Sequence, residues 1–213
     1  MKGILFAILS IILLANCDNA GNNTVNKTDS TKAIPIQVDT LKKDKSLRAD
    51  CSFTNPDTSV SGISLRNVQS TLAVLGERTK LHGDTTYAFY SSDQWQVLSL
   101  TIHPGDYYNQ VSVFHIYYSE DREWFRLKIK TKEFRTEKGI KLGIGKREII
   151  KKLGACYIAK DSSQNNVELY YRLELPDDSK TGLLQHHNMP VYYASYKLDN
   201  DKLVDIEFGF EYP

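Results

Sequence analysis

The sequence predicts an α+β protein made of two tandem repeats, each a short helical segment packed on an antiparallel sheet of about four strands. Two observations support this fold class. Residues 62–76 and 139–154 both begin and end with glycine and share apolar positions in between, which indicates an internal repeat. Each segment is followed by short β-type runs separated by turn residues, with no helical crossover between them, and this favours antiparallel pairing.

The first residues have the organisation of a bacterial lipoprotein signal. An apolar run at 4–15 follows a basic residue and is too short to serve comfortably as a permanent membrane helix. It ends in "LANC" (14–17), which resembles a lipobox, so we expect residues 1–16 to be removed and Cys17 to carry lipid. The same run also fits an ordinary signal peptide cut near Ala20, or a retained anchor.

The remaining chain divides into a tether and two repeats. Residues 17–59 are expected to form the lipidated cysteine and a flexible tether, because they are rich in Asn, Asp, Thr, Ser and Lys and contain few large apolar side chains. The first α+β repeat is expected at 60–136 and the second at 137–213.

The first repeat is expected to open with a short helix. Val68, Leu72 and Leu75 lie at the spacing of one helix face, with Ser64 as N-cap and Gly76 after the last turn. The strands predicted to follow are "YAFYSS" (87–92), "QWQVLSLTIH" (94–103), "QVSVFHIYY" (110–118) and "WFRLKIKTKEF" (124–134).

The second repeat has the stronger helix signals. Ile149, Ile150 and Leu153 form the apolar face, an acidic residue lies in the first turn and two lysines in the last, and Gly154 ends the helix. The strands predicted to follow are "CYIAK" (156–160), "VELYYRLEL" (167–175), "VYYASYKL" (191–198) and "KLVDIEFGFEY" (202–212). A hairpin turn is predicted at "LDNDK" (198–202), and the runs 127–132 and 203–210 alternate apolar inward and charged outward.

The glycine-bounded segment resembles a known repeat. The pattern G-I-x-L-G-x-x-K-x-E-x-x-x-x-L-G at 139–154 is similar to the repeat of the BLIP-like superfamily, which includes the beta-lactamase inhibitor proteins and the SmpA/OmlA (BamE) outer-membrane assembly lipoproteins. The resemblance covers about 62–213 and implies a helical segment on a small antiparallel sheet, present in tandem in the inhibitor proteins. It carries over no inhibitor loop or assembly contact, and the first copy is the weaker match.

Charge and cysteine content narrow the possible partners. The chain has 27 Lys and Arg and 26 Asp and Glu, and removal of the signal takes away Lys2 alone, which leaves 26 of each. A neutral mature chain argues against a nucleic-acid partner. If Cys17 is acylated, Cys51 and Cys156 remain as an even pair, which fits either one disulfide in an oxidising compartment or two buried thiols.

The motifs of common catalytic sites are missing from the sequence. A P-loop requires Ser or Thr after Gly145-Lys146, where the chain has Arg147, and no H-E-x-x-H or G-x-S-x-G pattern is present. We therefore expect no enzyme activity, no cofactor and no metal. His186 and His187 are adjacent and suit either a surface loop or a metal-binding loop.

Adjacent tyrosines are the feature that favours recognition. Because neighbouring strand residues point to opposite faces, one ring of each pair within a strand should enter the core and the other should lie outside. Outward tyrosines suit a protein-binding surface, although Tyr also simply favours strands. The predicted binding face comprises Tyr107, Tyr108, Tyr117, Tyr118, Tyr170, Tyr171, Tyr192 and Tyr193.

Charge is unevenly distributed along the second half. Lysine and arginine predominate over residues 128–152 and acidic residues over 199–211, which indicates either solvated faces or a basic side that meets anionic lipid or an acidic partner.

These observations together predict a non-catalytic protein-binding module, acting as a scaffold, an assembly factor or an inhibitor. Its partner would be another envelope or secreted protein. We expect it to be lipid-anchored to a membrane of the bacterial cell envelope, on the periplasmic or cell-surface side. The alternative is a small-ligand or metal-binding lipoprotein, or an unrecognised hydrolase, that uses the tyrosine-lined sheet with His186 and His187.

Overall fold

The computed structural model describes residues 52–120, 127–160, 165–175 and 181–212. These residues belong to one unit, residues 45–213. The predicted signal peptide, the predicted lipidation site Cys17, Cys51 and the predicted tether up to residue 51 lie outside the described part of the chain. In the part that is described, no helix has the length and apolar character needed to cross a membrane.

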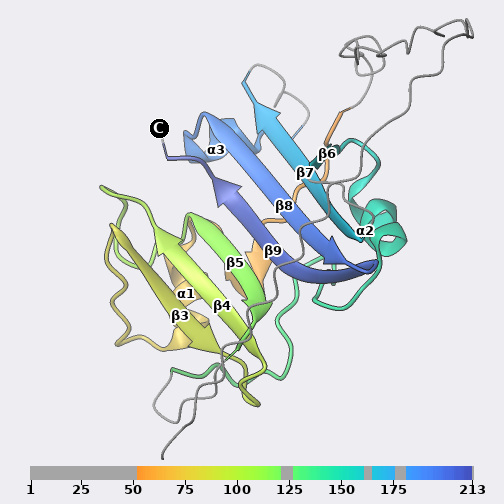
Figure 1. Cartoon of the computed structure of the whole chain (residues 1–213). Coiled ribbons are helices and arrows are strands. Elements are labelled where there is room, and N and C mark those ends of the chain that lie inside the picture. The colour runs from red at the N-terminus through yellow and green to blue at the C-terminus, as the bar shows by residue number, and fades with distance from the viewer. Residues whose placement is uncertain (1–51, 121–126, 161–164, 176–180, 213) are drawn as a thin grey trace, which may run out of the picture. The chain divides into compact units, whose positions relative to one another are not determined.

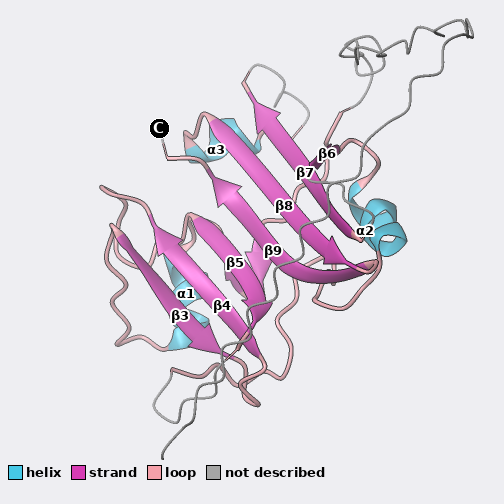
Figure 2. Cartoon of the chain, in the orientation of Figure 1, coloured by secondary structure: helices cyan, strands magenta, loops and turns pink. Residues whose placement is uncertain are grey.

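The fold is α+β and consists mostly of sheet (Figure 1). A seven-stranded sheet has the order β3-β4-β5-β9-β8-β7-β6, with every neighbouring pair antiparallel, and a two-stranded sheet pairs β1 with β2. The strands are β1 (Ser59–Val60), β2 (Ile63–Ser64), β3 (Thr85–Tyr90), β4 (Gln96–Ile102), β5 (Val113–Tyr118), β6 (Ile158–Lys160), β7 (Asn166–Glu174), β8 (Val191–Asp199) and β9 (Lys202–Phe210). The helices are α1 (Val68–Leu75), α2 (Lys146–Leu153) and α3 (Leu183–His187) (Figure 2).

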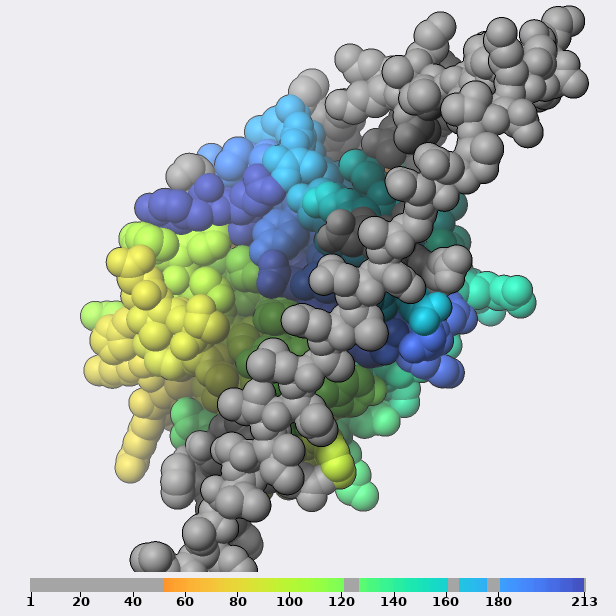
Figure 3. All heavy atoms as spheres, in the orientation of Figure 1, coloured from red at the N-terminus to blue at the C-terminus, as the bar shows by residue number. Residues whose placement is uncertain are grey.

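The two expected sheets are joined into one. Strand β5 from the first half pairs with β9 from the second half, from Val113 opposite Gly209 to Tyr117 opposite Asp205. The first-half strands, yellow to green, adjoin the blue second-half strands in the space-filling view (Figure 3). Joining the halves removes two sheet edges that would otherwise expose unpaired backbone groups.

The predicted strand at 124–134 is not found in its described part, residues 127–134. Instead, this segment passes the end of β3, where Tyr90 N donates to the Leu127 carbonyl at 2.8 Å and Ile129 N donates to the Tyr90 carbonyl at 2.9 Å. Leu127 is 63% exposed, so the predicted inward direction of its side chain is wrong. The backbone of Phe134 then donates to the Gln96 side chain at 2.7 Å, which draws Phe134 into the core.

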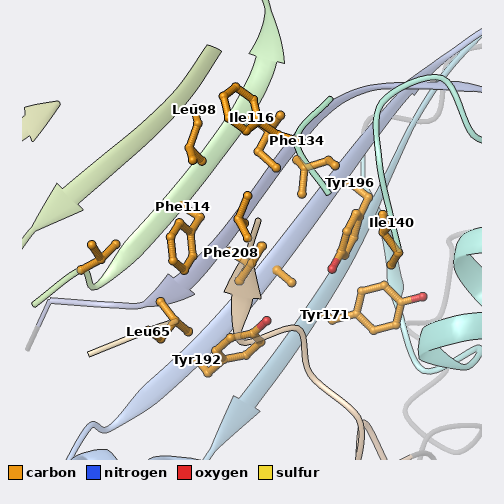
Figure 4. Packing of buried hydrophobic residues seen from close by; sticks show 14 of the residues in the cluster. Leu65, Leu98, Phe114, Ile116, Phe134, Ile140, Tyr171, Tyr192, Tyr196 and Phe208 are labelled. Carbon is orange, nitrogen blue, oxygen red and sulfur yellow. The ribbon is translucent and has the colours of Figure 1, made fainter. Parts of the chain in front are cut away.

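The main core lies on one face of the seven-stranded sheet, called here the inner face (Figure 4). Alternation along the strands brings buried side chains opposite one another, for example Phe114 opposite Phe208, with ring centroids 5.3 Å apart. Burial of aromatic and branched side chains in this way supplies most of the stabilisation of such a sheet, at about 25 cal/mol per Å² of apolar surface. The second half contributes three fully buried tyrosines, Tyr171, Tyr192 and Tyr196.

Helix α1 begins later than its sequence predicts. Asn67 is the N-cap, and its side-chain oxygen accepts a hydrogen bond from Ser70 N at 3.0 Å. The predicted cap, Ser64, belongs to β2 instead. The predicted face is confirmed in part: Val68, Leu72 and Leu75 are half-buried and Leu75 packs against the core, whereas Thr71 is the buried residue of α1. The neighbouring β1–β2 ribbon holds this end of the chain extended, so the helix starts three residues downstream.

Helix α2 agrees with its predicted pattern. Ile149 and Leu153 are buried, and Gly154 follows the last turn. Its N-cap, Gly145, has no side chain to accept a hydrogen bond, and Asp201 Oδ1 accepts one from Lys146 N at 3.1 Å instead. Asp201 lies in the turn between β8 and β9, which confirms the predicted hairpin and also caps a helix 55 positions away.

Residues 53–59 do not behave as the flexible tether that their composition predicts. Phe53 is buried, and its ring centroid lies 4.7 Å from that of Tyr171. The Asp57 carbonyl accepts a hydrogen bond from Tyr192 at 2.7 Å, and its carboxylate accepts one from Tyr196 at 2.5 Å. One aromatic anchor and these buried hydrogen bonds hold a polar segment against the inner face, which composition alone does not reveal.

Backbone hydrogen bonds and positive φ angles recur in the two halves at positions that lie 77 or 78 residues apart in the glycine-bounded segments. Both glycines that end α1 and α2 donate to the carbonyl four residues earlier at 2.8 Å. Arg66 N donates to the Val111 carbonyl just before β5, and Gly143 N donates to the Leu203 carbonyl at the start of β9, each at 2.7 Å. Positive φ angles recur in three pairs: Gly62 at 93° and Gly139 at 71°, Arg66 at 55° and Gly143 at 86°, and Gly76 at 98° and Gly154 at 88°.

Candidate binding face

The tyrosine pairs within β7 and β8 divide between the two faces of the sheet. Tyr171 and Tyr192 enter the core and are fully buried. Their neighbours Tyr170 and Tyr193 are half-buried and lie on the opposite side, called here the outer face. The alternation predicted for these two pairs is therefore confirmed, and only one ring of each is placed to meet a partner.

Of the other four tyrosines, only Tyr117 lies on the same outer face. Tyr117 is half-buried on the outer face, whereas Tyr118, at the end of β5, is 44% exposed. Tyr107 and Tyr108 are 79% and 57% exposed in the loop between β4 and β5, so the strand alternation does not apply to them. The predicted face of eight tyrosines is thus reduced to three outer-face rings, Tyr117, Tyr170 and Tyr193.

A cluster of titratable side chains occupies the centre of the outer face. His115 Nε2 lies 2.7 Å from Asp205 Oδ2, and His115 Nδ1 lies 3.9 Å from Glu207 Oε2. The Lys197 ammonium is 3.5 Å from Asp205 Oδ1. Burial by itself raises the pKa of Asp205, but the hydrogen bond from His115 and the charge of Lys197 outweigh it and hold the pKa below its ordinary value.

Tyr193 connects this cluster to the next strand. Its hydroxyl donates to Glu207 Oε1 at 2.7 Å, and its ring stacks on Tyr170 at a centroid distance of 6.4 Å and an angle of 22°. Burial, followed by the carboxylate of Glu207, raises the pKa of Tyr193 well above its ordinary value. The phenol therefore stays neutral at physiological pH and keeps its hydrogen-bonding proton.

Arg172, on β7, extends the same surface through hydrogen bonds to neighbouring side chains. Its guanidinium Nη2 donates to Glu211 Oε2 at 3.0 Å, and Nη1 donates to the Tyr170 hydroxyl at 3.1 Å. Hydrogen bonds to Glu211 and then Glu174 raise its pKa, so it is permanently charged. The Lys160 ammonium lies 3.2 Å from the Tyr170 ring centroid, in a cation–π contact. We call these connected side chains the polar band: His115, Tyr117, Tyr170, Arg172, Tyr193, Asp205 and Glu207.

The adjacent histidines lie away from the polar band, in the last turn of the short helix α3. The His186 and His187 rings are 4.7 Å apart, and the His187 ring is 5.3 Å from that of Phe210. Burial, and then the neighbouring His186, lowers the pKa of His187. They line a cavity of about 510 Å³ with Arg66 and the first turn of α1. Across the described ranges, no three His, Cys, Asp or Glu side chains gather as metal ligands there or elsewhere.

Cys156 lies between α2 and β6, half-buried against the core. It is disulfide-bonded, but Cys51 lies outside the described residues, so the pairing of these two cysteines stays a prediction.

Sequence reasoning did not predict that His115, Asp205 and Glu207 come together in the polar band. Alternation in "LVDIEFGF" does place Asp205 and Glu207 outward, but nothing local indicates that β9 pairs with β5. Only that pairing brings His115 to Asp205, 90 positions away. No protein-family model, curated protein or solved structure matches this chain.

Proposed function

We propose that this chain is a lipid-anchored, non-catalytic protein of the bacterial cell envelope that binds another envelope or secreted protein through the polar band. The observation that carries the proposal is the fixed arrangement of Tyr170, Arg172 and Tyr193. Tyr and Arg are enriched at the centres of protein interfaces. Because hydrogen bonds and ring stacking already hold these three side chains in place, a partner would bind with little further loss of side-chain entropy.

The binding proposal is tested with paired tyrosine variants. We expect a discrete partner to be cross-linked to the parent protein in intact envelopes, and the Tyr170→Ser/Tyr193→Ser variant to weaken its capture by roughly tenfold or more. The matched control is Tyr107→Ser/Tyr108→Ser, which removes two exposed rings from a loop away from the polar band. Cross-linking followed by mass spectrometry measures both, and thermal melting verifies that each variant is folded.

Two outcomes would contradict the binding proposal. Equal capture by the parent and both variants would place the interface elsewhere, and failure of the folded parent to capture a discrete protein would remove the protein-binding function itself.

The anchor is a separate proposal that rests on "LANC" at 14–17. Cys17→Ala should abolish incorporation of a labelled fatty acid and shift the protein from the membrane pellet to the soluble fraction, because stable anchoring depends on the acyl chains. Cys51→Ala is the control and should retain the label. Unchanged labelling of the Cys17→Ala variant would refute lipidation at this residue.

We also propose that the two halves, 60–136 and 137–213, are tandem repeats. Three pairs of positive φ angles at corresponding positions support this, as do two helices of eight residues that are each followed by a glycine C-cap. The resemblance to the BLIP-like repeat stays a hypothesis alongside it.

A further inference from the structure

A large cavity lies on the core side of the first half, away from the polar band. Its volume is about 940 Å³, and its walls are α1, β3 and the segment 127–135. Ligand sites in proteins measure roughly 300–1,000 Å³ and are mainly apolar with a few placed polar groups. The apolar lining consists of Val74, Leu75, Leu81, Tyr87, Phe89, Leu127 and Ile129.

The polar groups of the walls are already largely bonded within the protein. Thr79 donates its hydroxyl proton to the Leu75 carbonyl at 2.9 Å, and Thr131 donates to the Glu133 carbonyl at 2.9 Å. The Tyr87 hydroxyl accepts from His82 N at 2.8 Å. An apolar chain in the cavity would therefore displace water without breaking these hydrogen bonds.

Four cationic side chains surround this apolar interior: Lys80, Lys128, Lys130 and Arg135. The single acid among the lining residues, Glu133, is engaged by Lys141 at 2.9 Å and by Arg135 at 3.2 Å. The hydrogen bond from Lys141 lowers the pKa of Glu133 and keeps it ionised. Lys80 and Lys130 are exposed and make no ion pair with any described residue. The entrance therefore carries uncompensated positive charge.

We propose that this cavity binds a fatty-acid anion, with the alkyl chain against Phe89, Leu75 and Ile129 and the carboxylate at Lys80 and Lys130. Apolar walls alone would accept any alkyl chain, and the lysines select one with a negative head group. Leu127, which lines the cavity while 63% exposed, extends the apolar surface to the entrance. This site is separate from the outer face, so the inference does not depend on the proposed function.

Calorimetric titration of the purified full-length chain, cleared of carried-over lipid on a hydrophobic resin, tests the site. Three probes separate the two parts of the ligand: decanoate has the chain and the charge, 1-decanol has the chain only, and propionate has the charge with almost no chain. We expect saturable decanoate binding with one ligand per chain, at least roughly tenfold weaker binding of 1-decanol, and no measurable propionate binding.

Two variants locate the site, each with a matched control. Leu127→Asp places a negative charge at the entrance, and Leu175→Asp makes the same change at a leucine that is 49% exposed and outside the cavity. Lys80→Glu/Lys130→Glu reverses the charge of the two lysines that line the cavity. Its control, Lys151→Glu/Lys202→Glu, makes the same change in charge at two exposed lysines outside the lining.

We expect both cavity variants to weaken decanoate binding roughly tenfold or more and both controls to stay within about twofold of the parent. Absence of saturable decanoate binding, or equal binding by all folded variants, would overturn the site. Equal affinity for decanoate and 1-decanol would overturn the assignment of an anionic ligand. These readouts are independent of partner capture, so either proposal can fail alone.

Discussion

Gly209→Ala is expected to lower the free energy of unfolding by roughly 3 kcal/mol or more. A Cβ at this position would lie 2.2 Å from the Ser112 carbonyl oxygen and 2.7 Å from the Val113 Cα, both backbone atoms that a rotamer change cannot move. The clash falls where β5 pairs with β9, which is the one strand pairing that joins the two halves in the described sheet. Relief of the clash would therefore separate the two halves of the sheet.

Denaturant unfolding of the parent and the variant measures this loss. Gly105→Ala is the control, because a Cβ there meets nothing within 4 Å and only its φ of 81° opposes the substitution. We expect the control to cost about 1 to 2 kcal/mol. Equal losses for the two variants would show that the backbone at the β5–β9 junction shifts to accommodate the added methyl group. The close approach would then not require glycine at position 209.

Asp57 is expected to make the folded protein less stable as the pH rises from 4.5 to 7.5. Its carboxyl is fully buried, and burial is the main cause that raises its pKa from 3.8 to about 6, against the opposing hydrogen bond from Tyr196. The Lys138 ammonium is 3.7 Å from Oδ1, too far for a hydrogen bond, and Oδ1 has no hydrogen-bond partner among the described groups. The folded state therefore favours the neutral acid.

Stability falls with rising pH because the pKa of Asp57 is higher in the folded state than in the unfolded state. The stabilisation is fully present below the unfolded pKa of 3.8 and is lost as the pH rises through about 6. Between pH 4.5 and 7.5 the loss amounts to about 2 kcal/mol, since one pKa unit corresponds to about 1.4 kcal/mol.

Asp57→Asn isolates this contribution, because an amide cannot ionise. The difference in unfolding free energy between parent and Asp57→Asn should change by about 2 kcal/mol over this pH range. Asp84→Asn, at an exposed position, is the control and should leave the shape of the parent's curve unchanged. A difference between parent and Asp57→Asn that does not vary with pH would mean that Asp57 is ionised throughout.

Local patterns determined the elements of this protein. Runs of β-type residues between turn residues predicted seven of the eight expected strands, although the eighth, 124–134, failed because its described part turns away after three residues beside β3. Gly154 and the face of Ile149 and Leu153 defined α2, and turn residues defined the β8–β9 hairpin. These features depend on backbone sterics and on periodicity within a few residues, which the sequence carries directly.

Only the tertiary structure decided which distant segments meet. The pairing of β5 with β9 made one sheet of two halves and brought His115 to Asp205. Packing against the inner face ordered 53–59, and a turn 55 positions away supplied the cap of α2. The cavity beside α1 arose because segment 127–135 crosses beside β3 rather than extending the sheet. Each outcome depends on burial and register between segments far apart in the chain, and these are properties of the whole fold that no local pattern contains.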